Sequence, residues 1–300
     1  MIKDHLRNMK RWFLRWLGVL LTVSGSSVGA GVLVQFHTPA GVIAVELFDQ
    51  DKPFTVQNFL RYARGGVYTN MFLHNCQPAT VLQGGGYRTG DRSLYQPAKT
   101  FFTVPTFAPI RNEFSAGRRF SNTNGTLAMA TVPGHPDSAT SQWFFNLTNN
   151  SAKDTQNGGT TVFGRVVGGT NALFWFATLQ PGGGGVNPYG GIVNLTTWYG
   201  QNAAVFSALP VLYSGFTPPL YTDLAYVDIT VLATHIQRTT NGVTLSWNSV
   251  PNRTNRLQFS DQVPPLWRDL MIATGTGEIM TTTDLVALGT RRLYRVSVDY

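Results

Sequence analysis

Short apolar runs that recur between glycine- and proline-rich turns are the feature that most constrains this chain. Apolar and polar residues alternate over 32–36 and again over 42–48, and Gly41 marks a turn between the two runs. Further apolar runs lie at 80–82, 126–130, 143–147 and 161–167. Alternation with a period of two is typical of strands, and short strands at this spacing predict a closed β-barrel.

Other stretches of the first 235 residues predict the elements around this barrel. Val56, Phe59, Leu60 and Ala63 recur at helical spacing, and the glycine pair that begins at Gly65 ends the pattern, so we expect one amphipathic helix there. The alternating run over 224–232 can supply the last strand of the barrel. Residues 181–202 are rich in glycine, and we expect them to form a surface loop without a core element.

A second, smaller unit is expected after a boundary near 236–241. Runs at 243–247, 256–259, 270–273 and 293–298 are short and are separated by proline, glycine and aspartate, which predicts a small β-sandwich-like module over 241–300. Three hundred residues suit one domain of ordinary size and a smaller second one.

Composition limits the classes of function. With 43% hydrophobic and 13% charged residues, the chain is globular and not disordered. Five of its basic residues and one acidic residue lie in residues 1–30, so the formal charge of +8 falls to +4 without them, and we expect no nucleic-acid partner. The sequence has no spaced set of cysteine and histidine and no phosphate-binding loop, so no metal or cofactor is expected.

The first 30 residues have the order of a secretory signal peptide. A basic stretch ends at Arg15, an apolar run covers 16–23, and small residues follow up to Ala30. Cleavage near Ala30 would leave an exported protein, periplasmic or extracellular, without stable membrane insertion; an uncleaved anchor over 12–34 is the alternative. The single cysteine, Cys76, cannot form an internal disulfide, and a buried apolar role is favoured over a reactive thiol.

Two long motifs carry a family resemblance. Residues 72–86 read FLHNCQPATVLQGGG, and residues 124–130 (NGTLAMA) with 137–145 (DSATSQWFF) form the second motif. Further matching residues lie at 45–48, 58–59, 157–159 and 162–167. Over about 32–235 the chain resembles the cyclophilin-type peptidyl-prolyl cis-trans isomerases. The resemblance implies an eight-stranded antiparallel barrel capped by two helices, the second over 170–179, and a domain that covers 31–236.

The resemblance also assigns catalytic positions, and one of them has changed. In the family an arginine after the motif's histidine donates to the prolyl nitrogen; here His74 is followed by Asn75, and Gln83 matches a family glutamine. Asparagine offers a shorter, neutral amide where arginine offers a charged, rigid fork of donors. A large loss of rate is therefore expected, since one transition-state donor typically contributes a factor of roughly a hundred to a thousand.

The predicted proline pocket is altered as well. The large apolar side chains of the family pocket are matched by Thr80, Val81 and Phe144, and the family's histidine beside it is matched by Thr160. No leucine remains in the segment 152–154, which is one residue short. By the same resemblance, the remaining peptide-binding positions are Gln142 and the backbone of Ala130 and Thr131. Peptide binding is thus better preserved than catalysis.

Three functions stay open at this stage. The first is a slow or retuned prolyl isomerase that acts on proline-containing exported polypeptides, and it is the one we favour. The second is a non-catalytic module that binds extended, proline-containing peptides, and the third is a structural scaffold. Trp247, Trp267 and the run RRLYRV at 291–296 resemble small fibronectin-III-like modules of secreted bacterial proteins, and they identify no partner for the C-terminal module.

The signal-peptide pattern predicts that the mature protein begins near Gly31 and lies outside the cytoplasm. N-terminal sequencing of the protein recovered from the exported fraction checks this. An intact Met1 on protein from a soluble cytoplasmic fraction would contradict it.

Overall fold

The computed structural model describes residues 32–182, 190–196, 205–213, 218–232, 234–249, 254–263, 265–276, 278–287 and 291–299. The predicted signal segment, residues 1–30, lies outside these ranges. Within them, no helix has the length and apolar character needed to cross a bilayer.

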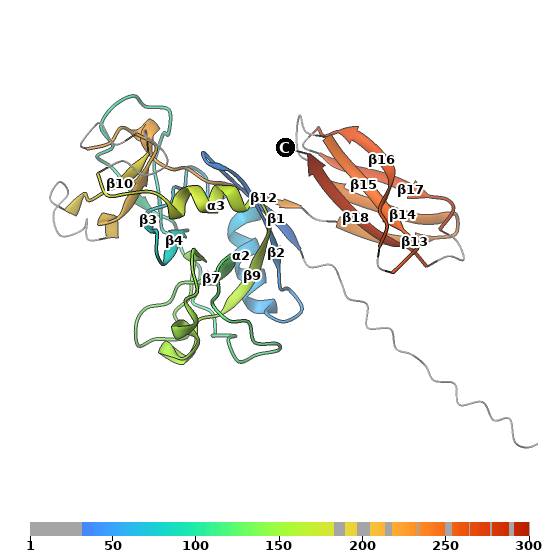
Figure 1. Cartoon of the computed structure of the whole chain (residues 1–300), viewed down its shortest axis with the longest axis horizontal. Coiled ribbons are helices and arrows are strands. Elements are labelled where there is room, and N and C mark those ends of the chain that lie inside the picture. Colours follow the sequence, from blue (N-terminus) through green and yellow to red (C-terminus); the bar gives the residue numbers. More distant parts are fainter. Residues whose placement is uncertain are drawn as a thin grey trace, which may run out of the picture. The chain divides into compact units, whose positions relative to one another are not determined.

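An antiparallel sheet of eight strands builds the first part of the described chain, in the order β12-β1-β2-β9-β7-β8-β4-β3. The strands are β1 (Leu33–Thr38), β2 (Gly41–Leu47), β3 (Asn75–Gln77), β4 (Val81–Gly84), β7 (Thr126–Met129), β8 (Trp143–Asn146), β9 (Val162–Gly168) and β12 (Asp228–Leu232). The sheet curls, and the helices α2 and α3 lie against it (Figure 1). The predicted mainly β class and the eight-stranded barrel are confirmed.

The two ends of the sheet are joined by residues that directly precede β3 and β12. The Leu73 N–H donates to the Ala225 carbonyl at 2.9 Å, and the Val227 N–H donates to the Met71 carbonyl at 3.1 Å. Phe72 and Tyr226 form a β-bridge between these two bonds. The predicted role of the run 224–232 in closing the barrel is therefore confirmed.

Aromatic side chains fill the inside of the barrel. The ring of Phe36 lies edge-on to Trp143 and Phe145, with centroids 4.9 and 5.0 Å away. Trp143 is fully buried and lies against the backbone of Gly84, where a Cβ atom would come within 2.6 Å of the indole ring. Only glycine fits this position, so the glycine after Gln83 is a packing requirement of the core.

The helix α2 (Pro53–Arg64) buries Val56, Phe59 and Leu60, as its spacing predicts. Its start is held by a reciprocal contact. Lys52, 1% exposed, donates to the carbonyl of Glu113 at 2.8 Å. The Glu113 carboxylate in turn accepts from the Thr55 N–H at 2.7 Å, where the helix N-terminus has unpaired donors. This contact fixes the loop around residue 113 to the helix.

The second helix, α3 (Thr170–Ala177), falls inside the predicted stretch 170–179 and buries Leu173 and Phe176. Gly169 precedes it with φ 75°, and a Cβ atom there would lie 1.8 Å from the Val42 carbonyl oxygen. The chain can turn into the helix at this point only because residue 169 is glycine.

A second hydrophobic cluster lies outside the barrel and corrects one expectation. The segment 181–202, expected to be a loop without a core element, contains the buried strand β10 (Gly191–Val193), which pairs with β11 (Leu209–Val211). This lobe also contains β5 (Tyr87–Arg88), β6 (Phe102–Thr103) and the 3-10 helix η4 (Tyr221–Asp223). Its cluster consists of Phe72, Ala98, Val193, Leu195, Phe206, Leu209, Val211, Tyr221 and Leu224. Glycine content alone did not predict the burial of β10, because the apolar side chains between the glycines pack against residues that are distant along the chain.

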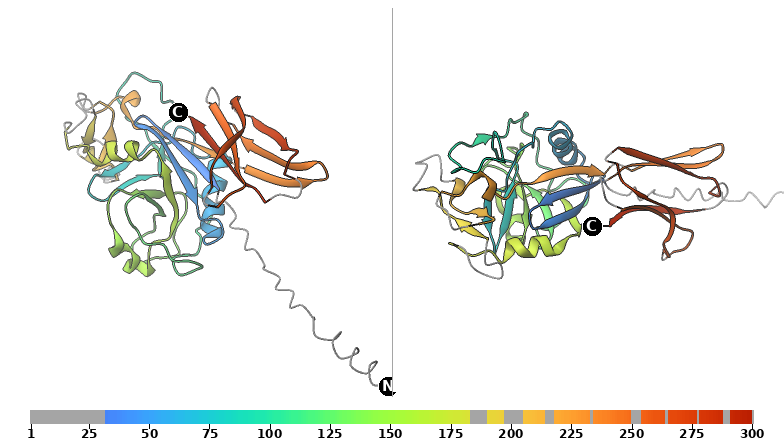
Figure 2. Two further views of the ribbon diagram at one scale, coloured as in Figure 1. Left: turned by 45° about the vertical axis from the view of Figure 1, so that its right-hand side comes forward. Right: turned by 90° about the horizontal axis from the view of Figure 1, so that it is seen from above.

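The C-terminal residues form two three-stranded sheets, ordered β13-β14-β17 and β16-β15-β18. Their strands are β13 (Thr234–Thr239), β14 (Gly242–Asn248), β15 (Thr254–Ser260), β16 (Arg268–Thr274), β17 (Ile279–Asp284) and β18 (Leu293–Asp299). Trp247 from one sheet and Leu257 from the other belong to one buried cluster. Figure 2, seen from above, shows the sheets as two layers, as expected for a sandwich-like module.

Strand β13 begins before the boundary expected at 236–241. It pairs with β14 over its whole length, so residues 234–239 belong to the C-terminal sheets. The last barrel strand ends at Leu232.

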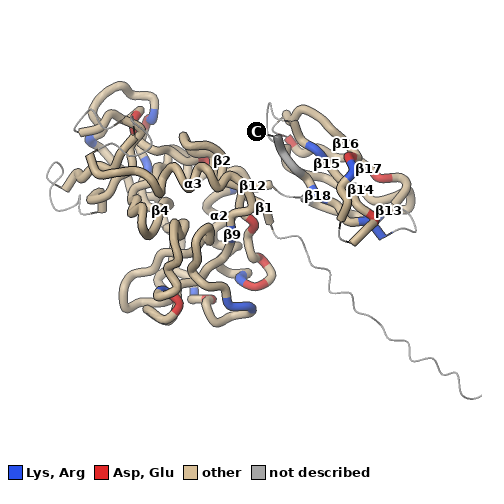
Figure 3. The backbone as a smooth tube through the Cα atoms, viewed as in Figure 1, with Lys and Arg blue, Asp and Glu red and all other residues tan. Residues whose placement is uncertain are grey.

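Figure 3 shows that the charged residues of the barrel lie mainly in its loops, in keeping with its apolar interior.

Because the barrel and the C-terminal module have separate buried clusters, a mature chain truncated after Leu232 is expected to fold. It should unfold in one cooperative thermal transition, measured by near- and far-ultraviolet circular dichroism. Loss of the near-ultraviolet signal or an insoluble fragment would show that the barrel needs the C-terminal strands.

Candidate active site

The two sequence motifs, about 60 residues apart, meet on three adjacent strands. In the β3–β4 pair Asn75 faces Gln83, and in the β4–β8 pair Gln83 faces Phe144. The predicted positions Asn75, Gln83 and Phe144 therefore lie in one row across the barrel wall. Strand register brings them together, because residues directly opposite each other on one face are neighbours.

A series of side-chain amides connects these positions. The Asn75 Nδ2 atom donates to Gln83 Oε1 at 3.2 Å, and Gln83 Nε2 donates to Gln142 Oε1 at 2.8 Å. Each N–H donor in the series is bonded to the carbonyl oxygen of the next amide, and these two hydrogen bonds hold all three side chains in place. The amide of Asn75 is thereby directed at Gln83.

His74 lies inside the wall behind this series. It is 3% exposed, and its Nδ1 atom has no hydrogen-bond partner. Its ring lies edge-on to Tyr87, with centroids 5.0 Å apart. Burial lowers the pKa of His74 to about 4, against the smaller opposite effect of a hydrogen bond with Gln142. His74 is therefore a neutral, buried imidazole next to Asn75.

A groove of about 500 Å³, here called the Phe144 groove, opens beside the amide series. Of the predicted site residues, it is lined by Val81, Gln83, Ala130, Thr131, Phe144 and Thr160. His74, Asn75 and Gln142 lie behind or beside it. Thr80 does not line it: its carbonyl accepts from the Leu147 N–H at 2.9 Å and from Asn150 Nδ2 at 2.8 Å, in the turn before β4.

The floor of the Phe144 groove is apolar. Phe144 and Val81 are 7% and 8% exposed, and they pack in one cluster with Ala128 and Val162. A stacked pair of rings, Phe48 and Phe120 with centroids 3.9 Å apart, supports this cluster. The floor thus retains an aromatic face of the kind that can accept a small apolar ring.

The sequence analysis missed one wall of this groove. The added lining residues are Met129, Pro133, Gly134, Lys153, Gln156 and Asn157. They come from the end of β7, from the loop after it, and from the 3-10 helices η1 (Ser151–Asp154) and η2 (Gln156–Gly158). Asn157 joins the two walls, since its Nδ2 atom donates to Thr131 Oγ1 at 3.1 Å and to the Val132 carbonyl at 3.1 Å. The sequence signals for this wall were the matched run 157–159 and the segment 152–154, which was compared with the family pocket.

The backbone of Thr131 is an unpaired edge. On either side of it the Ala130 N–H donates to the Gln142 carbonyl at 3.0 Å and the Val132 N–H to Ser138 Oγ at 2.7 Å. Within the described part of the chain, neither backbone group of Thr131 itself has a hydrogen-bond partner. An extended peptide in the groove can pair with it as an added strand.

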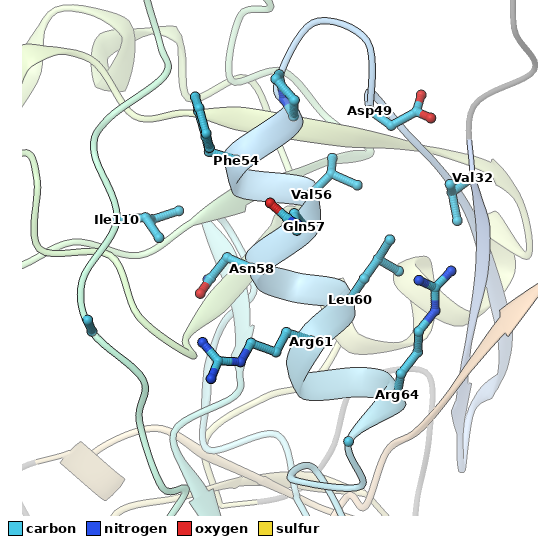
Figure 4. A pocket seen from close by; sticks show the side chains of 13 residues that line it. Val32, Asp49, Phe54, Val56, Gln57, Asn58, Leu60, Arg61, Arg64 and Ile110 are labelled. Atoms are coloured by element: carbon cyan, nitrogen blue, oxygen red, sulfur yellow. The ribbon is translucent and has the colours of Figure 1, made fainter.

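A wider groove, of about 1110 Å³, follows α2 but contains none of the predicted site residues. Val56, Leu60 and Arg64 point to the side of Val32, and Arg61 points to the opposite side (Figure 4). The described residues include no cluster of three or more histidine, cysteine or acidic side chains that could hold a metal ion. The Phe144 groove is therefore the candidate site on chemical grounds.

The family model for "Cyclophilin type peptidyl-prolyl cis-trans isomerase/CLD" matches residues 33–188, which include every strand of this site. The chain belongs to this family. The resemblance inferred from the two motifs is thereby confirmed.

Two curated relatives support this family, and one solved structure is also similar. The chain is 39% identical over 146 residues to peptidyl-prolyl cis-trans isomerase B of Escherichia coli (strain K12), covering 47% of this chain and 81% of that one. It is 35% identical over 146 residues to an Acinetobacter baylyi peptidyl-prolyl cis-trans isomerase, covering 48% and 71%. A solved Cryptosporidium parvum cyclophilin with the dipeptide Ala-Pro matches with a TM-score of 0.42 and 18% identity, over 67% of this chain and 99% of that one.

Burial of His74 predicts a pH dependence of stability. Its pKa of about 4 lies below the ordinary value of 6.5, so between these values the unfolded state binds a proton that the folded state does not. The free energy of unfolding should therefore decrease as the pH falls from about 6.5 to about 4, by roughly 1.4 kcal/mol per pH unit, and level off below that.

Denaturant titrations at several pH values check this, with His74→Gln expected to flatten the dependence. His135→Gln, at an exposed histidine, is the matched control and should leave it unchanged. If the wild type and His74→Gln lose stability in parallel, the pH dependence does not come from His74.

Proposed function

We propose that this chain is a slow peptidyl-prolyl cis-trans isomerase that acts on exported proteins. The observation that carries the proposal is the Phe144 groove, whose lining combines an apolar floor, the Gln83 side chain that donates to Gln142, and the unpaired backbone of Thr131. A proline ring on Phe144 would leave the flanking peptide backbone beside Thr131.

The chemistry needs no cofactor or covalent step. The prolyl bond has a barrier of about 18–20 kcal/mol because its C–N bond is partly double. A protein lowers it by binding the twisted amide more tightly than the planar one, with a donor to the prolyl nitrogen and fixed groups around the carbonyl. Gln83 and the Thr131 backbone supply the fixed groups around the carbonyl.

Asn75 is the reason for expecting a slow enzyme. Its amide donates to Gln83 and it does not line the groove. Arg88 of β5 and the loop arginines Arg92, Arg111, Arg118 and Arg119 do not line it either. Arg92, for example, is paired with Asp228 at 2.8 Å. A missing donor of this kind typically costs a factor of roughly a hundred to a thousand in rate.

A non-catalytic peptide-binding module is the second candidate. The placement of Asn75 and of Thr80 favours it, because both positions lie outside the groove while the binding edge at Thr131 is retained. The two candidates differ in rate and not in binding, so an isomerisation assay separates them.

Export is proposed from the N-terminal sequence, and the state of the single cysteine is compatible with it. Residues 1–30 have the basic, apolar and small-residue order of a signal peptide. The single cysteine, Cys76, is buried, and burial raises its pKa to about 12, which suppresses the reactive thiolate. Such a thiol is compatible with an oxidising compartment, and the substrates would be proline-containing polypeptides there.

Asn75→Arg is expected to increase the rate of prolyl isomerisation by about ten- to a thousandfold, because it restores a charged donor beside Gln83. Affinity for a proline peptide should change much less, since that donor acts mainly on the twisted amide. A protease-coupled isomerisation assay and a peptide titration measure the two effects.

Gln77→Arg adds the same charge to the exposed end of β3 and serves as the matched control, with no gain expected. An Asn75→Arg protein that is folded and binds the peptide but gains no activity would show that the missing donor is not the main defect. The binding-module function would then be the better one.

A further inference from the structure

The Phe144 groove carries a single kind of charge. Of the described residues that line it, Lys153 alone is charged, and the remaining lining is apolar, amide or hydroxyl. A bound peptide therefore meets one cation and no carboxylate in the groove wall.

Lys153 is held over the floor of the groove. It is half-buried in η1, and its Nζ atom lies 5.6 Å from the centroid of the Phe144 ring. Its carbonyl accepts from the Thr160 N–H at 3.0 Å, which fixes its backbone to a second lining residue. The ammonium group thus lies beside the ring on which a proline would pack.

No acidic side chain of the described chain neutralises this ammonium group, since no ion pair forms at Lys153 there. The adjacent carboxylate, Asp154, is turned to other partners: it accepts from Ser121 Oγ, and from the Asn122 N–H at 2.9 Å and Asn122 Nδ2 at 2.8 Å. Lys153 remains available to a ligand.

From this placement we infer that Lys153 selects prolyl peptides with a carboxylate on the residue next to the proline. The inference rests on the proposed function and names its substrate class. An aspartate or glutamate neighbour reaches the ammonium group while the proline covers Phe144, and a lysine or arginine neighbour is repelled. Because the site is partly screened from water, the charge pair is stronger than on an open surface but still weakens with salt.

Peptide affinity tests this directly. Otherwise identical peptides that carry Glu, Gln or Lys before or after the proline are titrated into the mature chain, followed by nuclear magnetic resonance. The Glu peptide of one series is expected to bind about three- to tenfold more tightly than its Gln counterpart at low salt, with the Lys peptide weakest. The difference should shrink at high salt.

Lys153→Met keeps an unbranched apolar stem over Phe144 and should abolish the preference, and Lys153→Glu should reverse it. Lys99→Met removes one charge from an exposed lysine outside the groove and should preserve it. Equal affinity of the wild type for Glu and Gln peptides would overturn the inference, as would a preference that survives Lys153→Met.

Isomerisation rates of the same peptides separate this inference from the proposed function. A carboxylate preference in binding without turnover would refute the isomerase and leave the selectivity of Lys153 standing. Turnover without the preference would refute the selectivity alone. If no proline peptide binds, both are wrong.

Discussion

The hydrogen bonds between residues 71–73 and 225–227 are the constraint on which the barrel depends. An eight-stranded sheet with open ends would expose unpaired N–H and C=O groups along two edges. Closure at residues 71–73 and 225–227 pairs part of these edges and completes the wall around the aromatic core of Phe36 and Trp143. It also positions the candidate site. His74 and Asn75 directly follow the closing residues, so the closing hydrogen bonds fix the direction in which the chain runs into β3.

The site then follows from strand register. Once β3, β4 and β8 are paired, Asn75, Gln83 and Phe144 must lie in one row. Close packing of Trp143 on Gly84 leaves little freedom for that register to shift, since a slip of one residue would turn the buried side chains outward. The amide series is thus a consequence of core packing. A substitution that changes the packing of the core would therefore also shift the side chains that line the groove.

The groove combines parts that differ in what they can do. Its apolar floor around Phe144 and the Thr131 edge are the parts suited to hold a proline-containing peptide. The donor that would stabilise the twisted amide is weak, since the amide of Asn75 donates to Gln83. Binding energy that is equal for the planar and twisted forms does not accelerate isomerisation. The proposed slow isomerase thus keeps the recognition surface and loses most of the differential binding.

The sequence by itself determined the β-rich class, both helices and the family, because alternation, helical spacing and contiguous motifs are local properties. Val81, Gln83 and Phe144, which it named as site residues, lie together on one groove. Tertiary structure decided the rest: Thr80 lies in a turn outside the groove, the glycine-rich segment contains the buried strand β10, and Lys153 lies over Phe144. Each of these outcomes depends on contacts between residues distant along the chain, which folding brings together and which no local pattern of residues encodes.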